Sequence, residues 1–473
     1  MGRAAAAALL LAVVLAAAAC GGSSGSATGT TASGADIAPA NALAFFSINT
    51  DQDSDQWQQA TELLQKFPIR KRARAALDDA LADEGLDFED DIRPALGPTF
   101  DVVLLDTGSD ETEFVGLTQP EDEDRFIDLL NRADEPIAHA TIGGWTAISD
   151  HQAALDAFRD SDATLADDDE FTEAMQELPE EANVVGFLNG SQASRALGNE
   201  VPGLPLSGAT EFKWVSFALS SQDNGWKIDG AAKGGPAVTG TLDWTLLDRV
   251  PSGALAAIAF KGASAATLER LRKDPDLSRA SAQVEQLLGV RLQDVVDLLS
   301  GDTVLYVRQG SPFPEATLVT KPKNVDGALR TLDNVAGRIS AFAGGTTPTR
   351  TKIGSIDVRK IPLGPAALYY GIDDGRLVAS TSTAPFHDVG GPSLEDDPVY
   401  KDAAEAVDLP LDANAIFYVN IRDATSVVEG LAQVAGEPLP RDLSSTLEPL
   451  ESLFGYSTTE NGIAHFSSLL QVS

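Results

Sequence analysis

Few residues in this chain have the type and the spacing that catalysis requires. The sequence contains four histidines, and none stands at a metal-ligand spacing from another: His139, His151, His387 and His465. It contains no Ser-x-x-Lys, no His-Glu-x-x-His and no phosphate-binding Walker motif. By residue type, His151 and His387 are the candidate general bases, so a hydrolase built around one of them is the enzymatic alternative. Because the motifs are missing, we expect that the protein is not an enzyme and that it binds no cofactor.

One acidic motif has the spacing of a calcium loop. Asp51, Asp53 and Asp55, with Glu62 at the twelfth position, match the acidic skeleton of such a loop. A calcium loop turns sharply at its sixth position, which is Gln56 here and not glycine. We therefore expect these acids to cap a helix N-terminus, where carboxylates accept backbone hydrogen bonds, and we expect no metal site.

Two further acidic runs, Asp167–Glu170 and Glu395–Asp397, stand before predicted helices. Their presence in both halves of the chain makes them more interesting than a single run would be. Their positions favour capping and helix-dipole roles, and a weak site for a divalent cation is the alternative.

The length and charge of the chain limit the classes of protein to consider. A chain of 473 residues fits two domains of about 200 residues each. The formal net charge is −37, from 71 acidic and 34 basic residues. Such a field repels phosphate backbones, so we expect no nucleic-acid partner. A solvated acidic surface that keeps an exported protein soluble is the simplest explanation of this charge.

The N-terminal residues have the layout of an export signal. Arg3 precedes an apolar run, Ala4–Ala16, and small residues lead to Cys20, the chain's single cysteine. Residues 1–19 therefore predict a secretory signal peptide. The arrangement resembles the lipobox of bacterial lipoproteins, in which the cysteine is lipidated, although Ala17 stands where leucine is usual. Lipidation of Cys20 is our expectation, and an ordinary secretory signal with an incidental cysteine is the alternative.

Residues 20–35 predict a lipidated cysteine followed by a flexible tether. The segment is rich in Gly, Ser, Thr and Ala and contains no large apolar residue before its end. Such a tether would hold a folded body away from the membrane. We therefore place the protein on the outer face of the bacterial cytoplasmic membrane, held there by the lipid anchor.

Short apolar runs and helical patterns alternate after the tether. In the first half, the runs that predict strands are 39–48, 100–105, 113–118, 139–142, 145–149, 183–188, 212–220 and 226–232. The helical patterns there are 51–67, 73–86, 87–96, 121–130, 152–159 and 170–178. Turn signals at Gly108–Asp110, Gly143–Gly144 and Asp223–Gly225 predict hairpins. Hairpins imply antiparallel pairing, so the predicted class is α+β, an antiparallel sheet with helices packed mainly on one face.

The second half repeats the landmarks of the first half in the same order. Pro39–Ile48 returns as Pro251–Phe260, and Asn183–Asn189 returns as Asn414–Asn420. The spacing between matching landmarks grows after Pro322, so the second copy contains an insertion, to which we assign the Gly344–Pro348 loop and a strand over residues 355–360. The chain therefore predicts two homologous domains: a first repeat over residues 36–233, a hinge over 234–248 and a second repeat over 249–473.

The opening Pro39-Ala40-Asn41-Ala42, placed after a lipoprotein-like tether, resembles an uncharacterised family of bacterial envelope lipoproteins. This family is a domain of unknown function with a Pro-Ala-x-Ala opening strand, and the resemblance extends over most of residues 37–473. It implies a location and an architecture, and it transfers no catalytic residue.

The sequence favours a lipid-anchored extracytoplasmic protein with a binding or scaffolding role. Its partners would be the membrane, through the anchor, and an envelope protein or an apolar ligand. A carrier of an apolar, lipid-like ligand held between sheet and helices is the second hypothesis, and the hydrolase is the third. The sequence identifies no ligand-binding residues.

Overall fold

The computed structural model describes residues 33–83, 85–93, 96–106, 113–132, 137–197, 212–235, 238–262, 279, 282, 285, 291–311, 313–342, 348–363, 366–387, 390–435 and 440–473. The predicted signal peptide, Cys20, most of the tether, the Gly108–Asp110 turn and nearly all of the Gly344–Pro348 loop lie outside these residues. No helix of the described part is long and apolar enough to cross a membrane.

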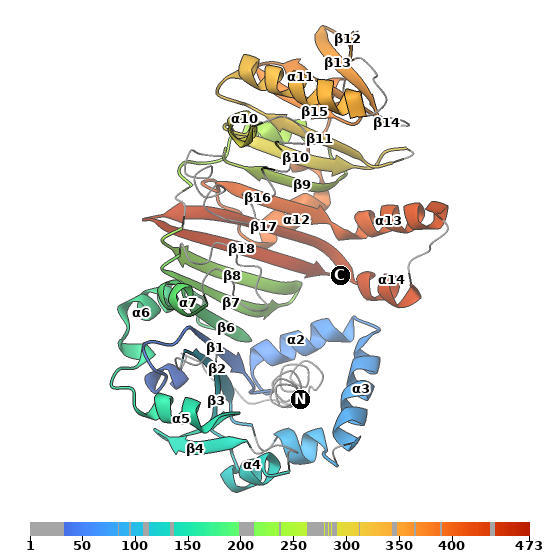
Figure 1. Cartoon of the computed structure of the whole chain (residues 1–473). Coiled ribbons are helices and arrows are strands. Elements are labelled where there is room, and N and C mark those ends of the chain that lie inside the picture. The colour runs from blue at the N-terminus through green and yellow to red at the C-terminus, as the bar shows by residue number, and fades with distance from the viewer. Residues whose placement is uncertain are drawn as a thin grey trace. The chain divides into compact units, whose positions relative to one another are not determined.

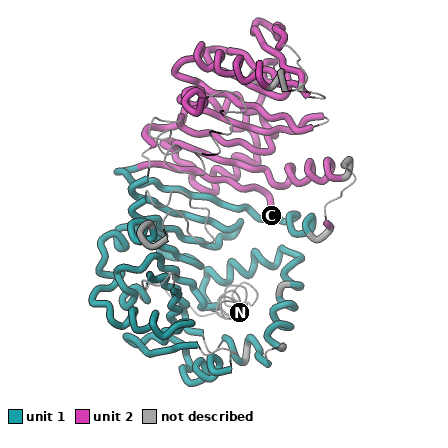
Figure 2. The backbone as a smooth tube through the Cα atoms, in the orientation of Figure 1, with its two compact units in different colours: residues 1–235, 441–449, 460–473 teal, residues 236–440, 450–459 magenta. Residues whose placement is uncertain are grey.

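The chain divides into two compact units (Figure 2). Unit 1 comprises residues 1–235, 441–449 and 460–473, and unit 2 comprises residues 236–440 and 450–459. The first boundary falls within the expected hinge, residues 234–248. The C-terminal strand is assigned to unit 1, whereas we had expected all of residues 249–473 to form the second repeat. The physical reason is that this strand pairs with residues 225–233 along most of its length.

Unit 1 contains the following elements, labelled as in Figure 1: η1 (Ser33–Asp36), β1 (Ala44–Asn49), α2 (Asp55–Gln65), α3 (Arg70–Asp83), η2 (Phe88–Ile92), β2 (Thr99–Leu105), β3 (Glu113–Thr118), α4 (Glu123–Leu130), β4 (Ala138–Ile142), β5 (Trp145–Ser149), α5 (Gln152–Arg159), η4 (Leu165–Asp167), α6 (Asp169–Gln176), β6 (Val184–Asn189), α7 (Gly190–Leu197), β7 (Trp214–Gln222), β8 (Gly225–Lys233), α14 (Arg441–Leu447) and β18 (Ile463–Val472). Its strands pair antiparallel in the order β4-β5-β3-β2-β1-β6-β7-β8-β18. The antiparallel pairing confirms the hairpin predictions, and Gly143 and Gly144, with φ of 58° and 85°, form the turn between β4 and β5.

Helices cover both faces of the unit 1 sheet, which corrects the expectation that they pack mainly on one face. Val103 and Leu105 of β2 belong to a core with α5 and α6. Phe100 and Val102 of the same strand belong to a second core with α3, η2 and α4. A strand whose residues are apolar in succession, as in 102–105, is buried on both sides, because successive side chains point to opposite faces.

Unit 2 contains the following elements: η6 (Trp244–Arg249), β9 (Ala254–Phe260), α10 (Leu292–Leu298), β10 (Thr303–Arg308), β11 (Glu315–Thr320), α11 (Val325–Phe342), β12 (Thr349–Ile353), β13 (Ile356–Leu363), β14 (Ala366–Asp373), β15 (Arg376–Ser380), η7 (Ala384–Phe386), η8 (Leu394–Asp396), α12 (Pro398–Ala406), β16 (Ala415–Asn420), α13 (Ile421–Ala435) and β17 (Leu450–Glu460). Its strands pair antiparallel in the order β12-β13-β14-β15-β11-β10-β9-β16-β17. Helices α10 and α11 cover part of one face, and Tyr400 of α12 packs against Tyr418 and Phe454 on the other.

The two units share a strand order. In unit 1, β1 lies between β2 and β6, and in unit 2, β9 lies between β10 and β16. Isolated bridges also correspond, since Pro39 pairs with Thr164 and Pro251 pairs with Ser393. The hairpin β12–β13 has no counterpart among the described residues of unit 1. It contains the strand expected over residues 355–360.

The connecting segment, the expected hinge over residues 234–248, contains a helix where its sequence pattern suggests a strand. Leu242, Trp244 and Leu246 alternate as in a strand, but residues 244–249 form the 3-10 helix η6. The side chain of Asp243 caps this helix by accepting a hydrogen bond from the backbone N–H of Thr245.

Candidate functional site

The two histidines that could act as general bases lie on the surface. His151 precedes α5, and its Nδ1 lies 2.7 Å from a carboxylate oxygen of Glu113. His387 follows η7 and is exposed. Neither histidine lines the hollows described below.

The calcium-like motif forms the start of α2. Ser54 is the N-cap of this helix, and Asp51 accepts a hydrogen bond of 2.9 Å from the backbone N–H of Asp53. Within the described part of the chain, His, Cys, Asp and Glu side chains form no group of three suited to a metal ion. Ser54, and not one of the acids, therefore caps the helix, which corrects the expected role of the motif; Asp51 stabilises the turn that leads into α2.

The two other acidic runs also cap helices. Asp168 accepts a hydrogen bond of 2.8 Å from the backbone N–H of Phe171 at the start of α6. Asp397 does the same at the start of α12, accepting from the N–H groups of Val399 and Tyr400, and it also accepts one from Gly253 before β9. Capping, one of the two roles considered for these runs, is what their contacts show.

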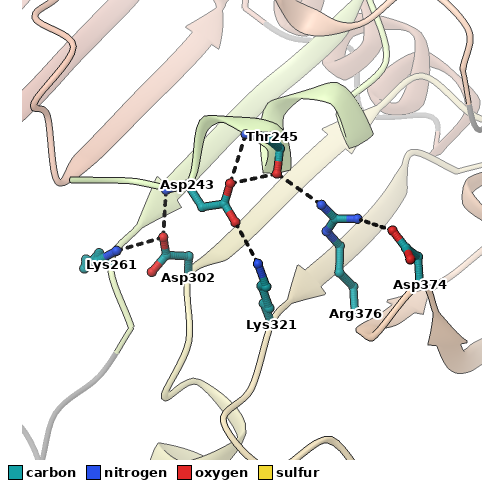
Figure 3. Close-up of polar contacts among 7 residues, drawn as sticks. All are labelled: Asp243, Thr245, Lys261, Asp302, Lys321, Asp374 and Arg376. Carbon is teal, nitrogen blue, oxygen red and sulfur yellow. Dashed lines mark hydrogen bonds and ion pairs between the residues drawn. The ribbon is translucent and has the colours of Figure 1, made fainter. Parts of the chain in front are cut away.

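A network of seven polar residues holds the connecting segment to unit 2 (Figure 3). Asp243 accepts hydrogen bonds from the hydroxyl of Thr245, at 2.7 Å, and from Lys321 of the segment after β11, at 3.2 Å. These bonds lower the pKa of Asp243, the one from Thr245 most strongly. The backbone N–H of Asp243 in turn donates to Asp302, which is also paired with Lys261.

Arg376 completes this network. Its guanidinium donates to the hydroxyl of Thr245 and to Asp374, both at 3.1 Å. The network contains three cations and three carboxylates, so its charges balance (Figure 3). Because most of these groups pair with one another, we interpret the network as a structural clamp. The buried Nε of Arg376 has no hydrogen-bond partner, and Thr245 and Arg376 also line the second hollow described below.

Two open hollows, one in each unit, are lined mainly by polar side chains. The first measures about 690 Å³ and lies beside the β7–β8 turn, with Gln56, Lys227 and Asp229 in its wall. The second measures about 440 Å³ and contains Arg249, Arg376, Asp248 and Asp396. Neither is an apolar cavity between sheet and helices of the kind the carrier hypothesis described.

The unit 2 sheet exposes a row of apolar side chains. Ile258 of β9 lies opposite Leu305 of β10, and these side chains are 47% and 41% exposed. Phe417 of β16 lies opposite Ile258, and Leu318 of β11 lies opposite Leu305, both half-buried. We call Phe417, Ile258, Leu305 and Leu318 the apolar row. It runs across the middle strands of the sheet, where exposed aliphatic side chains are costly.

The corresponding row of unit 1 is covered. Phe46 of β1 lies opposite Val102 of β2, and Val102 is only 8% exposed. Leu81 of α3, Phe88 of η2 and Phe126 of α4 pack over this row. Among the described residues, the same sheet position is therefore covered in unit 1 and partly exposed in unit 2, a difference that we did not derive from the sequence.

Unit 1 also contains a buried carboxylate that our sequence analysis missed. Asp101 of β2 is fully buried, and its Oδ2 accepts a hydrogen bond of 3.1 Å from the backbone N–H of Gly34. Its Oδ1 has no partner. Burial raises the pKa of Asp101 to about 6, although hydrogen bonds from Ser47 and Gly34 act in the opposite direction. The available signal was a single acid inside the apolar run 100–105.

None of the curated proteins matches this chain. Crystal forms I, III and IV of a protein called TP0453 show limited structural similarity, with sequence identities of 13%, 8% and 10% and TM-scores of 0.26, 0.23 and 0.22. The matched regions cover 47%, 43% and 43% of this chain and 77%, 80% and 83% of those chains.

One family model matches nearly the whole sequence. It is described as a protein of unknown function, DUF3352, and it matches residues 4–123 and 117–472. The chain therefore belongs to the DUF3352 family.

Proposed function

We propose that this protein is a lipid-anchored extracytoplasmic binding protein on the outer face of the bacterial cytoplasmic membrane. The proposed anchor is a lipid on Cys20, after removal of residues 1–19, and the Gly/Ser/Thr-rich segment that follows is the tether. The fold begins within the expected tether, because residues 33–35 belong to η1 and Gly34 and Ala35 are buried. Gly34, at the end of the tether, is held to the sheet through Asp101.

The proposal includes an internal duplication. The shared strand order around β1 and β9, and the matching bridges at Pro39 and Pro251, support two homologous repeats. In this proposal the second repeat has gained the β12–β13 hairpin and has an open apolar row.

The observation that carries the binding role is the exposure of the apolar row. Covering an aliphatic side chain fully contributes roughly 1.5–3 kcal/mol, so a partner over Ile258 and Leu305 would gain a substantial part of its binding free energy there. The exposed surface positions of His151 and His387 give the hydrolase alternative no comparable support.

The anchor is tested by cell fractionation of a Cys20→Ser variant. We expect the wild-type protein in the membrane fraction and the variant in the soluble extracytoplasmic fraction. A Ser24→Ala variant, altered in the same segment, is the control and should remain with the membrane. A Cys20→Ser protein that still sediments with the membrane would sink the anchoring claim.

A carrier of an apolar ligand is the second candidate, and the apolar row favours it over a purely scaffolding role. Delipidated protein is mixed with native membranes, recovered and analysed by mass spectrometry for bound lipid. We expect wild-type protein to recover lipid, and a double variant, Ile258→Asp with Leu305→Asp, to recover none. The control is Leu411→Asp, an 86% exposed leucine outside the row. Wild-type protein that recovers nothing would contradict the carrier role.

A further inference from the structure

The strongest concentration of positive charge in this acidic chain lies where α2 meets α3. Residues 63–77 contain five basic residues and no acidic residue, whereas the whole chain has 34 basic and 71 acidic residues. Figure 1 shows α2 and α3 meeting at a corner of unit 1. We call Arg70, Lys71, Arg72 and Arg74, at the start of α3, the basic corner.

Helix stability does not explain the basic corner. The positive end of the helix dipole lies at the N-terminus, so cations in the first turn are unfavourable and acids are favourable there. The first turn of α3 contains Arg70, Lys71 and Arg72 and no acidic residue. By contrast, α4 and α6 both begin with two acids. The charge of α3 is therefore opposite to the charge that would stabilise the helix.

The basic corner also faces solvent. Lys71 and Arg72 are exposed, and Arg70 and Arg74 are partly exposed. Arg74 makes one ion pair, with Asp78 at 3.8 Å, between side chains that are 41% and 53% exposed. A pair that long and that solvated contributes little. Ile69, immediately before the helix, is 45% exposed and adds an apolar contact beside the cations.

The basic corner and Ile69 together suit a surface that has anionic groups on its outside and an apolar layer beneath them. We propose that the basic corner docks unit 1 on the anionic headgroups of phospholipids, with Ile69 reaching the interface. The rest of the protein is strongly acidic and is repelled by such a surface, so the corner determines which face approaches it. This inference extends the proposed membrane location, and it is tested without the anchor.

The test uses the mature chain, residues 20–473, with Cys20→Ser and sedimentation with vesicles. One set contains equal parts of phosphatidylglycerol and phosphatidylcholine, and the other contains phosphatidylcholine alone. Each basic residue near an anionic surface strengthens binding roughly fivefold, so a triple variant (Arg70→Gln, Lys71→Gln, Arg72→Gln) should bind the anionic vesicles about 100-fold more weakly. Binding of the parent should weaken as salt rises, because ions screen the attraction.

The matched control removes three cations elsewhere. Arg350→Gln, Lys352→Gln and Lys360→Gln change the charge equally in the β12–β13 hairpin, and this variant should bind as the parent does. The basic-corner variant should melt at the same or a higher temperature, because the unfavourable dipole contacts are gone. Equal loss in both variants, or equal binding of the parent to both vesicle sets, would overturn the proposal. Parent binding to short duplex DNA but not to anionic vesicles would overturn it in favour of a nucleic-acid partner.

Discussion

Replacement of Asp101 by Asn should change how stability depends on pH. The folded protein raises the pKa of Asp101 from 3.8 to about 6 because the carboxylate is buried. A raised pKa means that the neutral acid is the better tolerated form. The stability that the folded protein gains from keeping Asp101 protonated is therefore complete below about pH 4. It declines as pH rises through about 6 and is lost above that. The shift of roughly 2 pKa units corresponds to about 3 kcal/mol.

Urea denaturation at a series of pH values between about 4 and 7.5 tests this reasoning. Asn cannot ionise, so the free energy of unfolding of Asp101→Asn, minus that of the parent, should rise by about 3 kcal/mol across this range. A Trp244→Phe background leaves tryptophans only in unit 1, and Trp145 and Trp214 there are buried near the N-terminal segment. The titration of other groups affects the variant and the parent equally, so it cancels when the two free energies of unfolding are subtracted. A difference that stays constant with pH would refute the argument.

Three further outcomes follow from the packing and the contacts. Leu117→Ala, in the core of unit 1, should lower the free energy of unfolding by about 2–5 kcal/mol in urea denaturation, whereas Leu305→Ala in the apolar row should lower it by less than about 1 kcal/mol; equal losses would contradict the exposure of the row. Asp243→Ala removes the cap of η6 and the partner of Lys321, so we expect a loss of about 1 kcal/mol by denaturation with Trp244 fluorescence as the probe, and an unchanged midpoint would show that the clamp is dispensable. His151→Ala breaks a pair between the exposed His151 and the largely buried Glu113, whose side chains are 59% and 12% exposed. It should change the melting temperature by less than about 2 °C, and a larger shift would mean that the pair is structurally important.

Much of the fold was predictable from local patterns. Short apolar runs next to Gly-containing turns identified β2, β5 and β8, since each of these strands adjoins a strong turn signal. The recurrence of Pro39–Ile48 as Pro251–Phe260 anticipated that β1 and β9 hold the same place in their sheets. The acidic runs were correctly given capping roles, because a cap depends on residues within one helical turn.

The features of the fold that could not be predicted from the sequence depend on contacts between residues far apart in the chain. Whether helices cover one face of a sheet or both is decided by packing, and the buried pattern of β2 was not interpreted in that way. The exposure of the apolar row has the same origin, because Phe46 and Ile258 occupy equivalent strands, and only Phe46 is packed against a helix-covered core among the described residues. The contact between Asp101 and Gly34 joins residues 67 positions apart, which no local pattern encodes.

The central claim is a body held at the outer face of the membrane through a lipid on Cys20. Mass spectrometry of the N-terminal peptide from protein purified out of its native membrane tests it most directly. The account predicts a peptide that begins at Cys20 and carries a diacylglycerol mass on the sulfur. An unmodified Cys20, or a chain that retains residues 1–19, would contradict it.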